Sequence, residues 1–162
     1  MLPRLSALVT SGRATAVVTA ACCLTIGMVV AAPLSAASNA RAAPLLYEFF
    51  ASVCHQIAER SFHLAGHPLA VCHRCFGFYV GFTLGLAALP FARRFRDWLL
   101  DRPRRILFFL APTAIDWLLP VNTAASRFGT ALLASAGIAL LVWAAIDQIT
   151  SRHAPKLLEE TP

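Results

Sequence analysis

Three cysteines and four histidines are concentrated in one short window of this chain. The whole sequence holds five cysteines and five histidines, and most of both lie between residues 54 and 79. They are Cys54, Cys72 and Cys75, with His55, His63, His67 and His73. Thiolate and imidazole groups are the side chains that transition metals prefer. The window therefore predicts a site with soft ligands, although it does not indicate a reaction, so whether the protein is an enzyme stays open.

A metal site is the first interpretation of this window. Three cysteines and one histidine form a common tetrahedral zinc set. We predict Cys54, Cys72 and Cys75 as ligands, with His55 as the fourth, while His73 and His67 are the other histidines in reach. Zinc is the expected metal, with iron or copper less favoured, because ligand type alone seldom selects between them.

The same cysteines allow two other interpretations. Cys72 and Cys75 form a Cys-x-x-Cys pair at the start of an apolar helix, where the helix dipole and Arg74 favour thiolate. Such a pair could exchange electrons as a membrane thiol–disulfide protein, with Cys54 as resolving partner. Alternatively, a structural disulfide could hold an external loop against the helix of a scaffold without catalysis. All three interpretations remain open at this point.

Six polar residues complete the candidate site. Asp116 lies inside an apolar segment, where a carboxylate is costly and is a functional candidate by default. Arg74 or Arg127 is its expected partner, and a buried ion pair that locks two helices is the structural alternative. Helix capping is the alternative for Asn122 and Arg127. The full set is Arg60, Arg74, Tyr79, Asp116, Asn122 and Arg127.

The composition indicates a membrane protein that holds these residues in a helix bundle. Hydrophobic residues make up 58% of the 162 residues and charged residues only 14%, whereas soluble domains carry about 25% charged residues. Apolar segments of nearly membrane-spanning length recur along the chain. They are Ala14–Leu34, Cys75–Ala92, Ile106–Val121 and Phe128–Ile146. We therefore predict an all-α integral membrane protein of about four transmembrane helices, in contact with the lipid bilayer.

Arginines indicate how the chain is oriented. The connection 93–105 contains six arginines and two aspartates, so the positive-inside rule places this short arginine-rich turn in the cytoplasm. This explains the net charge of +6 without a nucleic-acid partner. Both termini are then cytoplasmic in the cell membrane, and the Cys/His segment 45–75 is extracytoplasmic. We expect an anchor helix or a removable signal segment at 1–40, a membrane domain at 41–150 and a cytoplasmic tail at 151–162.

Three glycines mark a packing face on the second apolar segment. Gly77, Gly81 and Gly85 recur every four residues, a spacing that lets two membrane helices approach closely. Cys72, Cys75 and Tyr79 fall on another face of the same helix. We expect the glycine face to contact a neighbouring helix, while the oligomeric state is not predicted.

The ordered motifs resemble a known family. Cys54-His55-Gln56, Arg60-Ser61-Phe62, Gly66 and the run Cys72-His73-Arg74-Cys75-Phe76-Gly77-Phe78-Tyr79 stand in the order of its signature. Pro112, Asp116, Asn122, Arg127 and Gly129 follow in the expected order. The family consists of small predicted membrane proteins of bacteria and archaea with a domain of unknown function, and the resemblance covers about residues 45–140. It implies a multi-pass membrane protein and no particular reaction.

Overall fold

The computed structural model describes residues 2–89, 91, 93–119 and 122–159. The helices and strands are α1 (Leu2–Ala37), α2 (Ala42–Ala51), the 3-10 helix η1 (Ala58–Arg60), β1 (His63–Leu64), β2 (His67–Pro68), α3 (His73–Ala88), α4 (Arg93–Asp101), the 3-10 helix η2 (Pro103–Ile106), α5 (Leu107–Leu118) and α6 (Ala124–Glu159). Two of the predicted spans end at residues that lie outside the described ones, Ala92 and Val121. The last three residues of the predicted tail also lie outside them.

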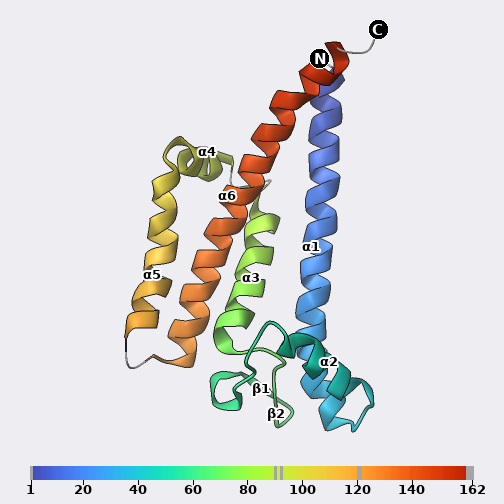
Figure 1. Ribbon diagram of the computed structural model, residues 1–162, viewed down its shortest axis with the longest axis vertical. Helices are drawn as coiled ribbons and strands as arrows, with labels where there is room; N and C mark the ends of the chain where they lie inside the picture. The colour runs from blue at the N-terminus through green and yellow to red at the C-terminus, as the bar shows by residue number, and fades with distance from the viewer. Residues whose placement is uncertain (1, 90, 92, 120–121, 160–162) are drawn as a thin grey trace.

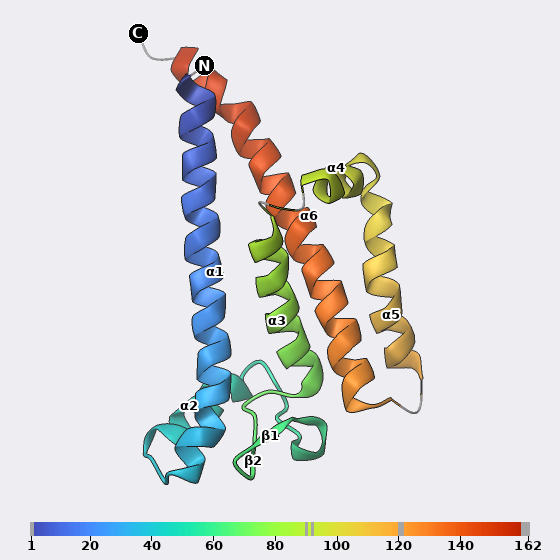
Figure 2. The ribbon, with the colours of Figure 1, turned by 180° about the vertical axis from the view of Figure 1, so that it is seen from behind.

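Four helices, α1, α3, α5 and α6, run lengthwise through the molecule (Figure 1). The short helix α2 and the hairpin β1–β2 gather at one end of this group, and both termini lie at the other end (Figure 2). The helix α4 lies crosswise between α3 and α5, at the end of these helices that is remote from the hairpin. The Cys/His window thus lies at the end of α3 opposite the arginine-rich connection.

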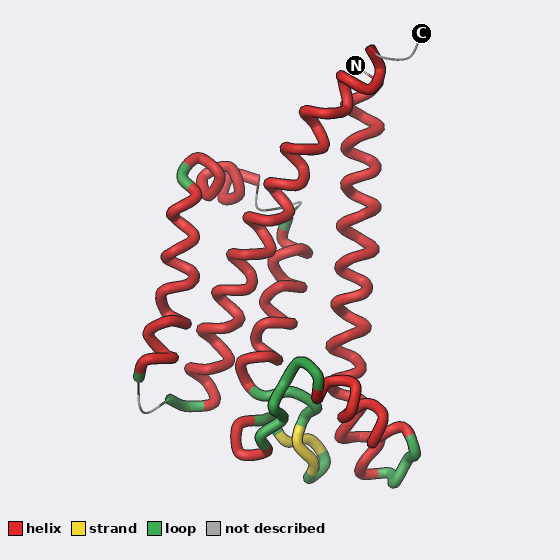
Figure 3. The backbone as a smooth tube through the Cα atoms, viewed as in Figure 1, coloured by secondary structure: helices red, strands yellow, loops and turns green. Residues whose placement is uncertain are grey.

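The prediction of a mostly helical protein is confirmed (Figure 3). Within the described residues, two helical segments are long and apolar enough to cross a membrane, Gly12–Ala37 and Ala124–Ile146. The helix α3 has 16 residues and α5 has 12, which correspond to about 24 Å and 18 Å along the axis. A bilayer core is about 30 Å thick. The number of four transmembrane helices therefore stays a prediction.

Two local features differ from the expectations. A small antiparallel hairpin pairs His63 with Pro68 and Leu64 with His67, and strands of two residues are too short to show an alternating pattern. Its turn residues Ala65 and Gly66 have φ of 52° and 82°, the left-handed conformation of primed hairpin turns.

The arginine-rich connection is the second difference, because it forms the helix α4 and the 3-10 helix η2 rather than a turn. The apolar residues Phe95, Trp98 and Leu99 share one side of α4 at helical spacing. Leu99 is fully buried, and the ring of Phe95 contacts Phe109 of α5 at 5.8 Å between centroids. These contacts stabilise a helix where charge alone suggested a loop.

The glycine face of α3 lies directly against α6. A Cβ atom at Gly77, Gly81 or Gly85 would collide with backbone atoms of α6. At Gly85 that Cβ would lie 2.7 Å from the carbonyl oxygen of Ala136. This close approach fixes how α3 sits on α6, and therefore which direction the opposite face of α3 points.

Candidate functional site

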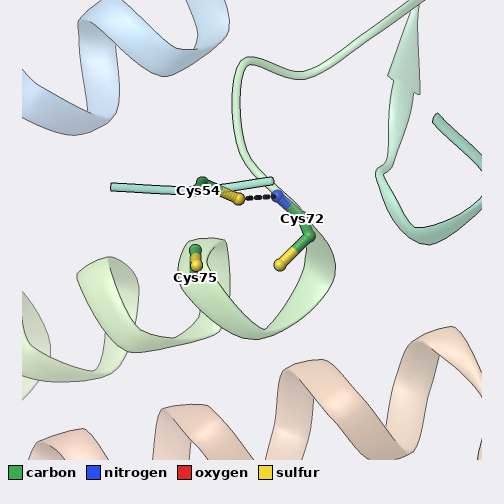
Figure 4. A group of neighbouring side chains, drawn as sticks. All are labelled: Cys54, Cys72 and Cys75. Carbon is green, nitrogen blue, oxygen red and sulfur yellow. Dashed lines mark hydrogen bonds between the residues drawn. The ribbon is translucent and has the colours of Figure 1, made fainter. Parts of the chain in front are cut away.

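The three predicted cysteine ligands converge at the start of α3. Cys72 is the N-cap of this helix, Cys75 lies in its first turn, and Cys54 follows α2. Their sulfur atoms all lie within 4.8 Å of one another, and Figure 4 shows all three side chains around one small space. The Cys54 Sγ accepts a hydrogen bond from the Cys72 N–H at 3.2 Å. The three thiols are free rather than joined in a disulfide.

Gln56 holds Cys54 in position. Its amide nitrogen donates hydrogen bonds to the carbonyl oxygens of Tyr47 at 2.7 Å and Ala70 at 2.8 Å. The Tyr47 hydroxyl in turn donates to the Pro68 carbonyl at 2.5 Å. Gln56 has a φ of 51°, an uncommon conformation for a residue other than glycine. The side chain thus ties the loop after α2 to the segment just before Cys72.

The helix start favours a thiolate at Cys72. The pKa of Cys72 is lowered to about 4, first by hydrogen bonding from the Cys75 thiol, with smaller contributions from the Cys54 thiol and the backbone N–H groups of Cys75 and Arg74, and against an opposing effect of burial. The thiolate is the form that binds metal or attacks a disulfide. A single negative charge is therefore expected within the cluster at neutral pH even without a metal.

The histidines are placed less favourably than the cysteines. Among the described residues, no imidazole nitrogen belongs to the group of converging sulfurs. His55 is exposed and lines the same cavity as the cysteines. His73 is 6% exposed, and its ring lies against Phe62 at 4.4 Å between centroids. His63 and His67 sit in the hairpin. His55 as the fourth ligand remains a prediction.

Four of the polar candidates, Arg74, Asp116, Asn122 and Arg127, form a connected set of hydrogen bonds beside the cysteines. Arg74 donates to the Asp116 carboxylate at 2.6 Å, and Asp116 is 4% exposed. Asn122 donates to the Asp116 carbonyl at 2.8 Å, and Arg127 donates to the Asn122 side-chain oxygen. Of the two partners expected for Asp116, Arg74 forms the ion pair. The chain of contacts connects the first turn of α3 to the ends of α5 and α6.

A cavity of about 450 Å³ lies between the three cysteines and these polar residues and is lined by both groups. It is lined by Val53, Cys54, His55, Ile57, Arg60, Cys72, His73, Arg74, Cys75, Trp117 and Arg127. Arg60 therefore lies with the candidate site. Tyr79 does not line this cavity, and its ring faces Phe50 at 6.4 Å between centroids. The functional roles of Arg60 and Tyr79, like those of the other candidates, remain predictions.

Trp117 is a lining residue that the sequence analysis did not single out. It follows Asp116 at the end of α5, and Arg74 stacks over its ring at 5.5 Å. A tryptophan at the end of an apolar segment is typical of the membrane interface. This position in the sequence was the signal that could have identified Trp117 as a candidate. Trp117 also lines an apolar cavity of about 680 Å³ between α3, α5 and α6.

The chain is similar to known proteins over the part that contains this site. A family model described as "Predicted membrane protein (DUF2085)" matches residues 54–143. An uncharacterized protein of Methanocaldococcus jannaschii is 38% identical over 71 residues, which cover 44% of this chain and 46% of that protein. An uncharacterized protein of Methanothermobacter thermautotrophicus is 35% identical over 100 residues, covering 57% and 86%.

The chain thus spans about half the length of the first relative and most of the second. No solved structure matches the chain. The matched region begins at Cys54 and includes the three cysteines, the Arg74–Asp116 pair and Arg127. The family match covers more than half of the 162 residues, and it confirms the resemblance. The chain belongs to this family of predicted membrane proteins.

Proposed function

We propose that this protein is a multi-pass membrane protein that binds one transition metal ion, with zinc as the first choice, through Cys54, Cys72 and Cys75. The observation that carries the proposal is the convergence of three sulfur atoms within 4.8 Å. Zinc–sulfur bonds of about 2.3 Å in a tetrahedral site place the sulfurs about 3.8 Å apart. The sulfur atoms therefore need to approach one another by about 1 Å at most to reach that spacing.

The chemistry of the donors supports a transition metal over a hard cation. Thiolates select zinc, copper(I) or iron, whereas calcium and magnesium prefer oxygen ligands. His55 is the proposed fourth ligand, because it lines the same cavity and is exposed enough to reorient. If a water molecule takes that position instead, the site resembles the three-ligand arrangement of catalytic zinc.

The charge distribution supports an extracytoplasmic location for the site in the cell membrane. We propose four transmembrane helices, α1, α3, α5 and α6, with both termini in the cytoplasm. The helix α4 with its arginines lies at one end of α3, and the sulfur cluster lies at the other. A reporter enzyme fused to the C-terminal tail should be active only on the cytoplasmic side, and external activity would reverse the proposed orientation.

Metal analysis of the purified protein tests the proposal directly. The parent protein should contain about one zinc per chain, and Cys54→Ser and Cys75→Ser should each lose most of it. Cys23→Ser is the matched control, because Cys23 is an exposed thiol on α1 outside the cluster. Equal metal content in the parent and Cys75→Ser proteins would end the metal proposal.

A thiol–disulfide function is the second candidate, because the pKa of Cys72 is lowered to about 4 through hydrogen bonding from Cys75. A redox protein should hold Cys72 and Cys75 in a disulfide that forms and breaks as the redox potential changes. Alkylation before and after reduction, followed by mass spectrometry, measures the fraction of the protein in which Cys72 and Cys75 form a disulfide. A pair that stays fully oxidised at every potential tested would indicate a structural disulfide.

A further inference from the structure

The cavity beside the cysteines carries more positive charge than its surroundings neutralise. Arg60, Arg74 and Arg127 all line it. Asp116 neutralises Arg74, whereas Arg60 and Arg127 form no ion pair with a carboxylate in the part of the chain that the structure describes. The contact of Arg127 with Asn122 fixes its guanidinium but leaves its charge in place. The Cys72 thiolate also lines the cavity and offsets one of these two charges, so a net positive charge remains and favours an anionic group.

Two buried polar atoms of residues that line this cavity have no hydrogen-bond partner among the described residues. They are the Nε of Arg74 and the Nδ1 of His73. A buried polar group that lacks a partner costs about 1–3 kcal/mol, so such atoms usually indicate a bound water, ion or ligand. The Arg74 Nε–H is a donor, and oxygen atoms of an anionic group would accept from it.

The polar cavity continues into an apolar one. The second cavity, of about 680 Å³, shares Arg74, Cys75 and Trp117 with the first. From there it extends along the bundle to Leu110 of α5 and Ile138 of α6. Seven residues separate Trp117 from Leu110, which corresponds to about 10 Å of helix. Beyond the shared end, the lining is apolar except for Thr113, whose hydroxyl donates to the Thr130 carbonyl at 2.7 Å.

We infer that the two cavities together bind an anionic amphiphile, with its negatively charged headgroup among the arginines and its hydrocarbon chain between α3 and α5. Charge complementarity selects the headgroup, and the apolar lining suits the chain. The direction also fits a bilayer, because the polar cavity lies at the outer end of α3 and the apolar cavity extends toward the membrane interior. Each volume falls in the range of about 300–1,000 Å³ typical of ligand sites.

The inference deepens the proposed function, because it places a lipid headgroup beside the sulfur cluster. It rests on the proposed membrane orientation but does not require a metal. The arginines and the apolar cavity should bind the amphiphile whether or not Cys54, Cys72 and Cys75 hold an ion.

Trp117 offers a direct measurement, because it lines both cavities and is 72% exposed. The full chain is placed in nanodiscs of uncharged phosphatidylcholine, and brominated-chain phosphatidic acid is added to quench tryptophan fluorescence. Brominated-chain phosphatidylcholine at the same mole fraction is the comparison lipid, and Trp117→Phe identifies the signal. We expect half-maximal quenching of Trp117 at a mole fraction about tenfold lower for the anionic lipid.

Variants separate the headgroup site from general attraction between charges. Arg127→Gln removes a charged hydrogen-bond donor from the cavity and should raise the half-maximal mole fraction about tenfold, as expected for one charged hydrogen bond. Arg41→Gln is the matched control, since it removes one exposed charge near α2 but outside the cavity, and it should change nothing. Thermal unfolding verifies that both variants remain folded.

Three results would overturn the inference. They are equal quenching by the two lipids, equal effects of Arg127→Gln and Arg41→Gln, and displacement of the anionic lipid by inorganic phosphate alone. The Cys54→Ser protein distinguishes this inference from the metal proposal. Retained lipid selectivity in the Cys54→Ser protein would support the amphiphile site independently of any metal, whereas the zinc content of the parent protein decides the metal proposal.

Discussion

The two faces of α3 use the same helix for opposite purposes. On the glycine face, Gly77, Gly81 and Gly85 leave no room for even one added carbon against α6. On the other face, Cys72 and Cys75 border a cavity of about 450 Å³. On the glycine face, the available volume limits which residues can be accommodated. On the other face, the chemistry of the side chains matters more than their size. Close contact with α6 fixes the helix, and a buried cluster that includes Val29, Phe50 and Val71 packs around the cysteines at its start.

The largest expected effect comes from adding volume to the glycine face. Gly81→Leu would place a side chain against the Leu132 carbonyl and the Ser135 hydroxyl of α6, and we expect a loss of about 4 kcal/mol or more in the free energy of unfolding. Gly129→Leu is the control, because nothing lies within 4 Å of a Cβ there. Denaturant unfolding in detergent measures both. Similar stability of the two variants would contradict the proposed importance of close packing.

The second effect tests whether charge matters more than volume at the end of α3 that carries the cysteines. Asp116→Asn keeps the size of the side chain but leaves the Arg74 guanidinium without its carboxylate, and we expect a loss of about 3 kcal/mol. The double variant with Arg74→Gln should lose less than the sum of the two single changes, because neither charge is then left unpaired. Additive losses would show that the pair is not coupled.

The Asp116→Asn variant also separates a functional role from a structural one. If Asp116 serves binding or catalysis, the variant should lose lipid selectivity or activity at temperatures where it is still fully folded. If the residue only locks α3 to α5, function should decline in parallel with the folded fraction.

A smaller loss of stability is expected from a change in the loop that follows α2. Gln56→Ala removes two hydrogen bonds to the Tyr47 and Ala70 carbonyls and should cost about 2 kcal/mol. It should also weaken metal binding, because Cys54 is two residues away. Asn39→Ala is the matched control: Asn39 has a similar φ of 54° but lies outside the site. Zinc affinity measured by chelator competition should change only for Gln56→Ala.

Much of this arrangement follows from short-range patterns. The spacing of Cys72 and Cys75 within one helical turn places both thiols at the start of α3 whatever the rest of the chain does. Asp116 in an apolar segment required a cation, and Arg74 is one of two that the sequence offered. The composition alone predicted a helical membrane protein, which the family match supports.

The parts that the sequence analysis missed depend on contacts between distant segments. Gln56 acts through carbonyl groups at Tyr47 and Ala70, which no local pattern reveals. The helix α4 forms because Phe95 and Leu99 find apolar partners in the bundle, while the arginine content suggested a turn. His55 was favoured as a ligand by adjacency to Cys54; it lines the same cavity, and its role as the fourth ligand remains a prediction.

The smallest expected effect is a change in the reactivity of a thiol at the start of α3 that leaves the fold intact. The pKa of Cys72 is lowered to about 4, first by hydrogen bonding from the Cys75 thiol, whereas an ordinary thiol has a pKa of about 8.5. Because the pKa is lower in the folded chain, the associated stabilisation is complete above the ordinary value. It declines as the pH falls and is lost as the pH passes through about 4.

In chelator-treated protein, the rate constant for alkylation of Cys72 should therefore stay constant from pH 8 to about 5 and fall by half near pH 4. Cys75→Ala removes the largest cause of the lowered pKa and should move the midpoint upward, while Cys75→Ser keeps an O–H donor and should move it less. Trypsin cleaves after Arg60 and Arg74, so Cys54, Cys72 and Cys75 fall in different peptides and mass spectrometry follows each one. A parent midpoint near the ordinary thiol value would show that Cys72 is not selectively activated. Equal midpoints in the Cys75→Ala and Cys75→Ser proteins would assign the shift to the helix start, because the backbone N–H groups are present in both variants.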